Sequence, residues 1–340
     1  MMTFSAFPLP QPQSPPSLSE SQARMVRALD ERRFFKLIGG GSFTEGDKIA
    51  QLSNIYSRAG VDCIDIAPDA ALIETVWRAV QSVQGPKPVI MVSIPLDADP
   101  HFRKIELTEA DCIGCGLCLP VCPTEAFTLS SALEVSQNLC YGCGRCVPTC
   151  PTDALRLLPF QVESQIEAAL KHPATEAVEI HSHFVDAYML EAFLNRWGHL
   201  LHNKLVALCF RLDQPDDPQV LSFVQTAQRR HAMPILLQID GLPMSGTTHL
   251  EASLPALEAA VRARHIFEKN NLQAPPITIS GGINQQTACL LQQAPYQWIA
   301  GAGMGTVARQ AVWNLNEPEA LAVATQITQA FQSRSADRRL

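Results

Sequence analysis

Short runs of apolar residues alternate along the chain with longer segments whose apolar positions recur every three or four residues. Apolar runs of four to eight residues are typical of buried strands, and the three-to-four spacing is typical of amphipathic helices. The runs predict eight strands, FFKLI at 34–38, DCIDIA at 62–67, PVIMVSI at 88–94, AVEIHS at 177–182, KLVALCF at 204–210, PILLQID at 234–240, PITIS at 276–280 and QWIAGAG at 297–303. The helical spacing predicts segments at 44–59, from about Asp69, at 161–171, 184–200, 218–230, 250–270, 284–293, 304–313 and 317–332.

One segment between the third strand and the third helix breaks this alternation because it is rich in cysteine. CIGCGLCLPVCP at 112–123 and CYGCGRCVPTCP at 140–151 share the spacing C-x2-C-x2-C-x3-C-P, and their flanks repeat as well. In bacterial ferredoxins with two clusters, three cysteines of each run bind one cluster and the fourth binds the other. We therefore predict two 4Fe–4S clusters, one on Cys112, Cys115, Cys118 and Cys150 and one on Cys140, Cys143, Cys146 and Cys122.

Other uses of these cysteines are less consistent with the pattern. Zinc sites usually take two CxxC pairs with a longer gap, and disulfides need an oxidising compartment, which nothing in the sequence indicates. A cluster that loses one iron in oxygen would become 3Fe–4S. The remaining cysteines, Cys63, Cys209 and Cys289, are expected to be buried structural thiols, with a redox-sensing thiol as the alternative.

The alternation of strands and helices predicts parallel strands joined by crossover helices. Eight such units in about 280 residues fit a (β/α)8 barrel. An open doubly wound sheet would carry a glycine-rich dinucleotide turn, which IGGGSF at 38–43 does not match. The predicted fold class is α/β, a (β/α)8 TIM-type barrel with a two-cluster ferredoxin-like (α+β) domain inserted after strand three.

The composition is that of a globular protein, and the net charge argues against two classes of partner. The 340 residues are 46% hydrophobic and 17% charged, which is typical of a globular protein. The net charge of −7 argues against nucleic acid or an anionic membrane as partner, and neither a membrane span nor an export signal is seen, so we expect a cytoplasmic protein. The expected parts are a disordered proline-rich tail at 1–20, barrel at 21–102, the ferredoxin-like insert at 103–158, barrel at 159–333 and a disordered tail at 334–340.

Candidate ligand-binding residues gather where a barrel has its mouth. All βα loops lie at the carboxyl ends of the strands, so the insert should lie over that face. SGGIN at 280–284 and GAGMG at 301–305 follow strands seven and eight, where barrels often bind phosphate, and a plain turn is an equal alternative. The candidate phosphate-binding residues are Gly281, Gly282, Gly301 and Gly303.

Ionisable and amide side chains also interrupt the apolar strands. They are Lys36, Asp65, Glu179, His181, Arg211, Gln238 and Asp240. Because barrel interiors are mostly filled by apolar residues, these side chains predict a lined pocket, with a buried ion-pair network as the alternative. DGLPMSGTTHL at 240–250 is a candidate lid after strand six.

The order of these parts resembles one family, the light-dependent period proteins of cyanobacteria. The resemblance is carried by CIGCGLCLPVCPTEAF and CYGCGRCVPTCPTDAL together with FFKLIGGGSF, QIDGLPMSG and ISGGIN before GAGMGT, and it covers nearly the whole chain after the tail. It implies an iron–sulfur redox sensor that feeds the photosynthetic state of the cell to the circadian clock. Clock-associated sensor kinases and clock-core proteins would be its partners. No catalytic residue is transferred by the resemblance.

Three functions compete at this point. A sensor would take electrons from a photosynthetic carrier or a quinone and change its affinity for partner proteins. A flavin-dependent oxidoreductase would use the clusters to carry electrons to a flavin in the barrel. A simple electron carrier would leave the barrel without a role. We favour the sensor because the sequence offers no flavin or catalytic motif.

Overall fold

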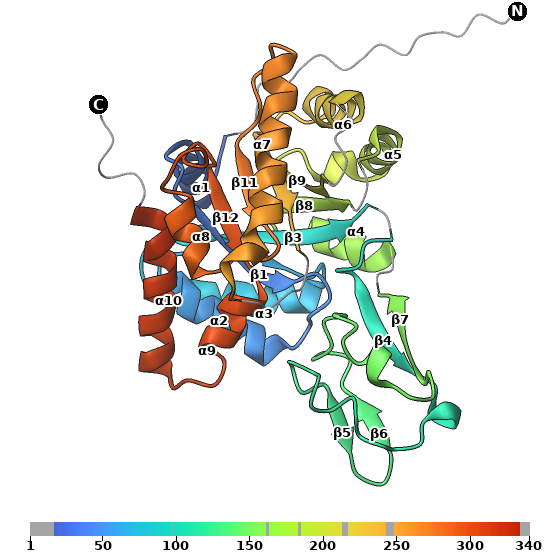
Figure 1. The fold of residues 1–340 in the computed structure, drawn as a ribbon. Helices are drawn as coiled ribbons and strands as arrows, with labels where there is room; N and C mark the ends of the chain where they lie inside the picture. Colours follow the sequence, from blue (N-terminus) through green and yellow to red (C-terminus); the bar gives the residue numbers. More distant parts are fainter. Residues whose placement is uncertain are drawn as a thin grey trace, which may run out of the picture.

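The computed structural model describes residues 17–96, 98–160, 163–182, 185–212, 217–242 and 248–333. Eight parallel strands close into a barrel in the order β1-β2-β3-β8-β9-β10-β11-β12 (Figure 1). Their bounds are β1 Phe34–Gly40, β2 Cys63–Ile66, β3 Val89–Pro95, β8 Ala177–Ser182, β9 Leu205–Arg211, β10 Ile235–Asp240, β11 Ile277–Ser280 and β12 Gly301–Met304. The predicted (β/α)8 barrel is confirmed.

Helices surround the barrel and cover the outward faces of its strands. Their bounds are α2 Gly46–Arg58, α3 Ala70–Gln81, α4 Glu163–Lys171, α5 Ala187–Trp197, α6 Asp217–Arg230, α7 Leu254–Lys269, α8 Gln285–Leu290, α9 Thr306–Val312 and α10 Glu317–Gln332, with 3₁₀ turns η3 Gly198–Leu200 and η4 Leu250–Ser253. The main apolar core lies between these helices and the strands. In the described part of the chain, no helix is both long and apolar enough to span a membrane.

Strand β12 begins four residues later than the sequence predicts. The expected strand covered 297–303, but pairing with both neighbours starts at Gly301, opposite Phe34 of β1 and Thr278 of β11. A Cβ atom on Gly301 would lie 2.1 Å from the carbonyl oxygen of Phe34. The strand therefore starts where the absence of a side chain lets the two backbones approach.

Helix α1, Glu20–Asp30, was not predicted and closes the amino end of the barrel. Ser19 caps it, since the Ser19 hydroxyl accepts from the N–H of Gln22 while the Gln22 side chain accepts from the N–H of Ser19. Its buried Met25, Ala28 and Leu29 pack against inward-facing residues at the amino ends of the strands. The predicted tail 1–20 thus overlaps a helix start, and 1–16 and 334–340 lie outside the described residues.

The cysteine segment forms a separate small unit beside the barrel (Figure 1). Strand β4, Arg103–Leu107, pairs antiparallel with β7, Leu155–Pro159, and β5, Phe127–Leu129, pairs with β6, Leu133–Val135. The rest of the insert consists of turns and the 3₁₀ segments η1 Glu109–Asp111 and η2 Val147–Thr149. The first strand of one repeat therefore pairs with the last strand of the other, which brings the two ends of the insert together.

Candidate functional site

The eight motif cysteines lie around two separate hollows of the insert. One hollow is lined by Cys112, Cys115, Cys118 and Cys150, and the other by Cys122, Cys140, Cys143 and Cys146. None of the 11 cysteines, all of which are among the described residues, forms a disulfide. Each hollow thus collects three cysteines of one run and the last cysteine of the other run.

The loops around these hollows fit iron–sulfur clusters. Gly114, Gly116, Gly142 and Gly144 have φ values of 65°, 72°, 69° and 74°, a region that residues with a side chain rarely adopt. Two backbone amides donate to ligand sulfurs, Ile105 to Cys140 at 3.5 Å and Ala126 to Cys122 at 3.3 Å. Amide-to-sulfur hydrogen bonds of this kind stabilise cluster thiolates and tune their potentials. When bound, a cluster in either hollow would supply one-electron chemistry.

The two hollows differ in their surroundings. Around the first, Cys115 is exposed, and the neighbouring Ile113 and Leu117 are 67% and 52% exposed. Around the second, Cys140 and Cys146 are buried, and Tyr141 from the same ligand loop is buried as well. The first hollow therefore faces solvent, whereas the wall of the second is shared with the barrel.

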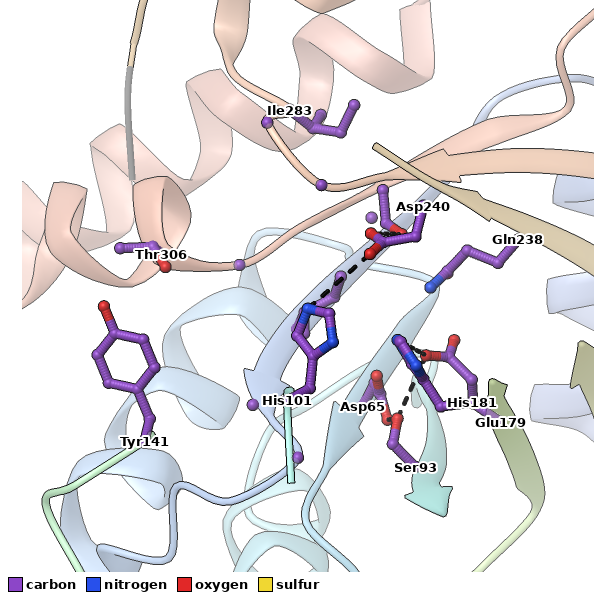
Figure 2. A pocket seen from close by; sticks show the side chains of 18 of the residues that line it. Asp65, Ser93, His101, Tyr141, Glu179, His181, Gln238, Asp240, Ile283 and Thr306 are labelled. Carbon is purple, nitrogen blue, oxygen red and sulfur yellow. Dashed lines mark hydrogen bonds and ion pairs between the residues drawn. The ribbon is translucent and has the colours of Figure 1, made fainter. Parts of the chain in front are cut away.

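Tyr141 extends from the second ligand loop into the barrel mouth (Figure 2). Its ring centroid lies 5.2 Å from the guanidinium carbon of Arg309, a cation–π contact. Arg309 is itself buried and donates to the carbonyl oxygens of Ile38 at 2.8 Å and Gly39 at 3.0 Å. Burial raises the pKa of the Tyr141 phenol to about 12, so it stays protonated at neutral pH.

A polar pocket occupies the carboxyl end of the barrel (Figure 2). Five of the seven predicted pocket residues line it, namely Asp65, Glu179, His181, Gln238 and Asp240. Lys36 lies among them without reaching the lining, and Arg211 is half-buried at the end of β9, outside the lining. The pocket is also lined by five residues that were not predicted, Ser93, His101, Tyr141, Thr306 and Arg309.

Lys36 holds two carboxylates at the base of this pocket. Its Nζ lies 3.4 Å from Asp65 Oδ2 and makes a shorter contact with Glu179 Oε2, and all three residues are buried. Burial alone would lower the pKa of Lys36, but Glu179 and Asp65 outweigh it and raise that pKa above its usual value. Burial raises the pKa of Asp65 to about 6. The pocket and the buried ion-pair network thus share Asp65 and Glu179.

A pair of histidines shares one carboxylate above this base. His181 Nδ1 lies 2.8 Å from Asp99 Oδ2, and His101 Nδ1 lies 2.8 Å from Asp99 Oδ1. Burial would raise the pKa of Asp99, but the two histidines more than offset it and hold that pKa below its usual range. Because Asp99 engages both Nδ1 atoms, His181 Nε2 is turned toward Glu179, and the His181 ring also bonds the thiol of Cys209. His101 Nε2 lies 3.9 Å from Asp240 Oδ2 (Figure 2).

The candidate phosphate-binding glycines are constrained by packing. Gly281, Gly282 and Gly303 line the pocket, whereas Gly301 does not. A Cβ atom would lie 2.6 Å from Asp240 Oδ1 at Gly281 and 2.0 Å from the carbonyl oxygen of Ala252 at Gly282. These close approaches explain the glycines without a ligand, and the Asp240 carboxylate would repel a phosphate. Phosphate binding stays a prediction, and residues 243–247 of the predicted lid lie outside the described residues.

The three cysteines outside the motifs differ from one another. Cys63 and Cys209 are buried in strands, as predicted. Cys289 is exposed, so the prediction that it is a buried thiol is wrong. It belongs to the six-residue helix α8, whose buried residues are Thr287 and Ala288.

Comparisons with known sequences agree on one family. The profile "LdpA Fe-S cluster-binding domain" matches residues 121–159, and "Light dependent period A C-terminal domain" matches 169–334. A "4Fe-4S binding domain" profile matches 105–128. Light dependent period A of Synechococcus elongatus is 30% identical over 349 residues, which cover 86% of this chain and 85% of that protein.

Solved structures resemble the chain only loosely. Tryptophan synthase from M. tuberculosis, in an open form with BRD0059 bound, has a TM-score of 0.48 at 10% identity, covering 93% of this chain and 100% of that one. (S)-3-O-geranylgeranylglyceryl phosphate synthase from Thermoplasma acidophilum, with sn-glycerol-1-phosphate, has a TM-score of 0.47 at 13% identity, covering 91% and 98%. The family of the chain is assigned from the sequence matches and not from these structures.

Proposed function

This chain belongs to the light dependent period A family and carries a 4Fe–4S binding domain, and from that premise we propose that it is a cytoplasmic redox sensor of the circadian clock. Two 4Fe–4S clusters, one in each cysteine hollow, take electrons from a photosynthetic carrier or a quinone. The redox state is passed on through protein partners. These partners are clock-associated sensor kinases and clock-core proteins.

The contact of Tyr141 with Arg309 is the observation that supports a sensor best. Reduction adds one negative charge to a cluster, and the second hollow includes Cys140 and Cys143, which flank Tyr141 in the sequence. At a separation on the order of 10 Å and an effective dielectric constant of about 20, one charge changes the energy of a buried cation by roughly 1.5 kcal/mol. That energy corresponds to about tenfold in a binding constant. Arg309 would transmit the change to the β1 carbonyls that it binds.

A flavin-dependent oxidoreductase is the second candidate, and the position of the pocket favours it. The pocket wall includes Tyr141, so an electron from the second cluster would arrive beside any ligand in the barrel. The carboxylate of Asp240 beside Gly281 counts against a bound flavin phosphate at that turn. Heat denaturation of the anaerobically purified protein decides between the candidates, since stoichiometric flavin in the supernatant would favour the enzyme.

The sensor proposal is tested by measuring partner affinity in two redox states. The protein is purified anaerobically, and its binding to a clock-associated sensor kinase is measured before and after reduction with dithionite. We expect the dissociation constants to differ by about tenfold. Tyr141→Leu should reduce this difference while the visible absorption of the clusters is kept. Equal affinities of the oxidised and reduced wild type would overturn the proposal.

The matched control for this experiment is a tyrosine away from the insert. Tyr188 is 84% exposed at the start of α5, so its removal alters no buried contact. Tyr188→Leu should keep the full redox dependence of binding. A loss of the dependence in both variants would show that the Tyr141 effect is not specific to the contact with Arg309.

A further inference from the structure

Three buried side chains of the barrel wall offer metal-ligating atoms to one place. Glu179 and His181 point inward from β8, and Cys209 points inward from β9, where it pairs in register with His181. One carboxylate oxygen, one imidazole nitrogen and one sulfur from these residues all lie within 4.8 Å of one another. A thiolate, an imidazole and a carboxylate together are ligands that suit zinc.

Each of the three is held in place by a second residue. His181 Nδ1 donates to Asp99 Oδ2 at 2.8 Å, which directs Nε2 toward the other two side chains. Glu179 is bound by Lys36 at Oε2, which leaves Oε1 on the side of His181. Gln238 Nε2 donates to Cys209 Sγ at 3.4 Å. Partners of this kind orient the ligands of metal sites, and a carboxylate behind a histidine is the commonest of them.

The spacing of His181 and Glu179 suits a shared cation better than a direct contact, whereas the His181 ring already hydrogen-bonds the thiol of Cys209. His181 Nε2 and Glu179 Oε1 are 4.0 Å apart, which is too long for a hydrogen bond. Ligand atoms around a tetrahedral zinc, at bond lengths of about 2.0–2.1 Å, are roughly 3.4 Å apart. A shift of each of these two atoms by a few tenths of an ångström would bring them to that separation.

The charge of the surroundings points the same way. Four buried carboxylates lie in and beside the pocket, those of Asp65, Asp99, Glu179 and Asp240. Lys36 contacts Asp65 and Glu179, and the two histidines contact Asp99. Two buried oxygens near the place, Gln238 Oε1 and Asp240 Oδ2, have no hydrogen-bond partner among the described residues. Unpartnered buried acceptors are costly, and an excess of buried carboxylates favours a cation. Both features are what a bound cation with a coordinated water would satisfy.

We propose that the barrel mouth binds one zinc ion through Glu179 Oε1, His181 Nε2 and Cys209 Sγ. Three protein ligands leave the fourth position open toward the pocket, where Asp240 and His101 face it, and water fills that position. The site is separate from the eight motif cysteines and is independent of the sensor proposal, because neither its ligands nor their partners belong to the insert strands.

The first test measures zinc binding to the cluster-loaded protein. Wild type, purified anaerobically, is equilibrated by dialysis against micromolar Zn²⁺, and zinc and iron are counted per chain by mass spectrometry. We expect about one zinc with no loss of iron. His181→Asn and Cys209→Ser should each weaken zinc binding by at least about tenfold, and so should Asp99→Asn through its effect on the orientation of His181. Cys289→Ser, at an exposed thiol in α8, is the matched control and should bind as wild type does.

The second test does not depend on the folding of any variant. Crystals of the wild type grown with Zn²⁺ are measured on both sides of the zinc absorption edge. An anomalous peak between Glu179, His181 and Cys209 supports the proposal. Zinc found only at the motif cysteines, with iron lost in proportion, overturns it. Wild-type affinity in both His181→Asn and Cys209→Ser overturns it too, since the barrel network would then be a metal-free set of hydrogen bonds.

Discussion

The aromatic ring of Tyr141 lies 5.2 Å from the guanidinium carbon of Arg309, and this contact joins the cysteine insert to the rim of the barrel. Tyr141 belongs to a ligand loop, whereas Arg309 belongs to α9 and binds the carbonyl oxygens at the end of β1. An arginine keeps its charge in a protein. A change of charge nearby therefore alters the energy of its contacts and not its protonation. The insert therefore contacts the barrel at a buried cation.

The interleaved cysteine groups predict that each run depends on the other. Cys150→Ala should damage the cluster held by Cys112, Cys115 and Cys118, although it lies in the second run, because it lines the first hollow. Iron and acid-labile sulfide should fall from about eight of each per chain to about four. Electron paramagnetic resonance of the reduced protein would show which cluster is lost.

Cys122→Ala is the reciprocal variant and should damage the cluster of the second run. Cys63→Ala, at a buried strand position far from the motifs in sequence, should leave the iron content unchanged. A wild-type preparation dominated by zinc, or damage confined to the run that carries the substitution, would contradict the assignment.

The insert should be removable from the barrel. Its two ends are adjacent, since the N–H of Phe160 donates to the carbonyl oxygen of Phe102 at 3.0 Å, and it contributes none of the eight barrel strands. Deletion of 103–158 with a short glycine linker should leave a folded protein with the helical circular dichroism of the barrel. A molten product that binds hydrophobic dye would show that the barrel needs the insert, for example through the buried ring of Tyr141.

Lys36→Met should destabilise the barrel strongly. Removing this ammonium leaves the carboxylates of Asp65 and Glu179 buried without their cation, and breaking a buried ion pair from one side costs about 3–5 kcal/mol. Lys171→Met removes an exposed, solvent-screened pair with Glu167 one turn away in α4 and should leave the stability almost unchanged. Urea unfolding followed by circular dichroism measures both, and equal effects would mean that Lys36 carries no structural charge.

Gly282→Ala should cost more than Gly85→Ala. Both glycines have a positive φ, 79° and 92°, so an added side chain strains both backbones by about 1–2 kcal/mol. Around Gly85 a Cβ atom meets nothing within 4 Å, whereas at Gly282 it would lie 2.0 Å from the carbonyl oxygen of Ala252. The clash should add about 1–3 kcal/mol to the cost in urea unfolding. Equal losses would show that the turn relaxes freely.

The strands could be predicted because each is an apolar run of suitable length. The run at 177–182 matches β8 in full, since both faces of a parallel strand are buried. The start of β12 was missed because Trp298 and Ile299 are apolar without being paired, and pairing depends on where the neighbours permit it. The capping signal for α1, Ser19 with Gln22 three residues on, was present but follows directly on a proline-rich segment.

The barrel pocket was predictable where its residues interrupt apolar strands or form the glycine turns after the last two strands. Glu179 and Asp240 stand out as charges in buried runs, and both line the pocket. Asp99 and His101 come from the irregular segment between β3 and β4, and Arg309 comes from a helix that reads as amphipathic. No periodicity marks such residues. They meet only because the barrel closes and because the insert folds back over the segment between β3 and β4.

The amino-terminal helix α1 closes the barrel at the amino ends of its strands. Met25, Ala28 and Leu29 fill the amino end of the barrel. In the described part of the chain, a ligand in the pocket would therefore leave at the carboxyl end, past Phe102 and Tyr141. The two ends of the barrel thus depend on different parts of the chain: the amino end is filled by α1, and the carboxyl end is bordered by Tyr141 of the insert.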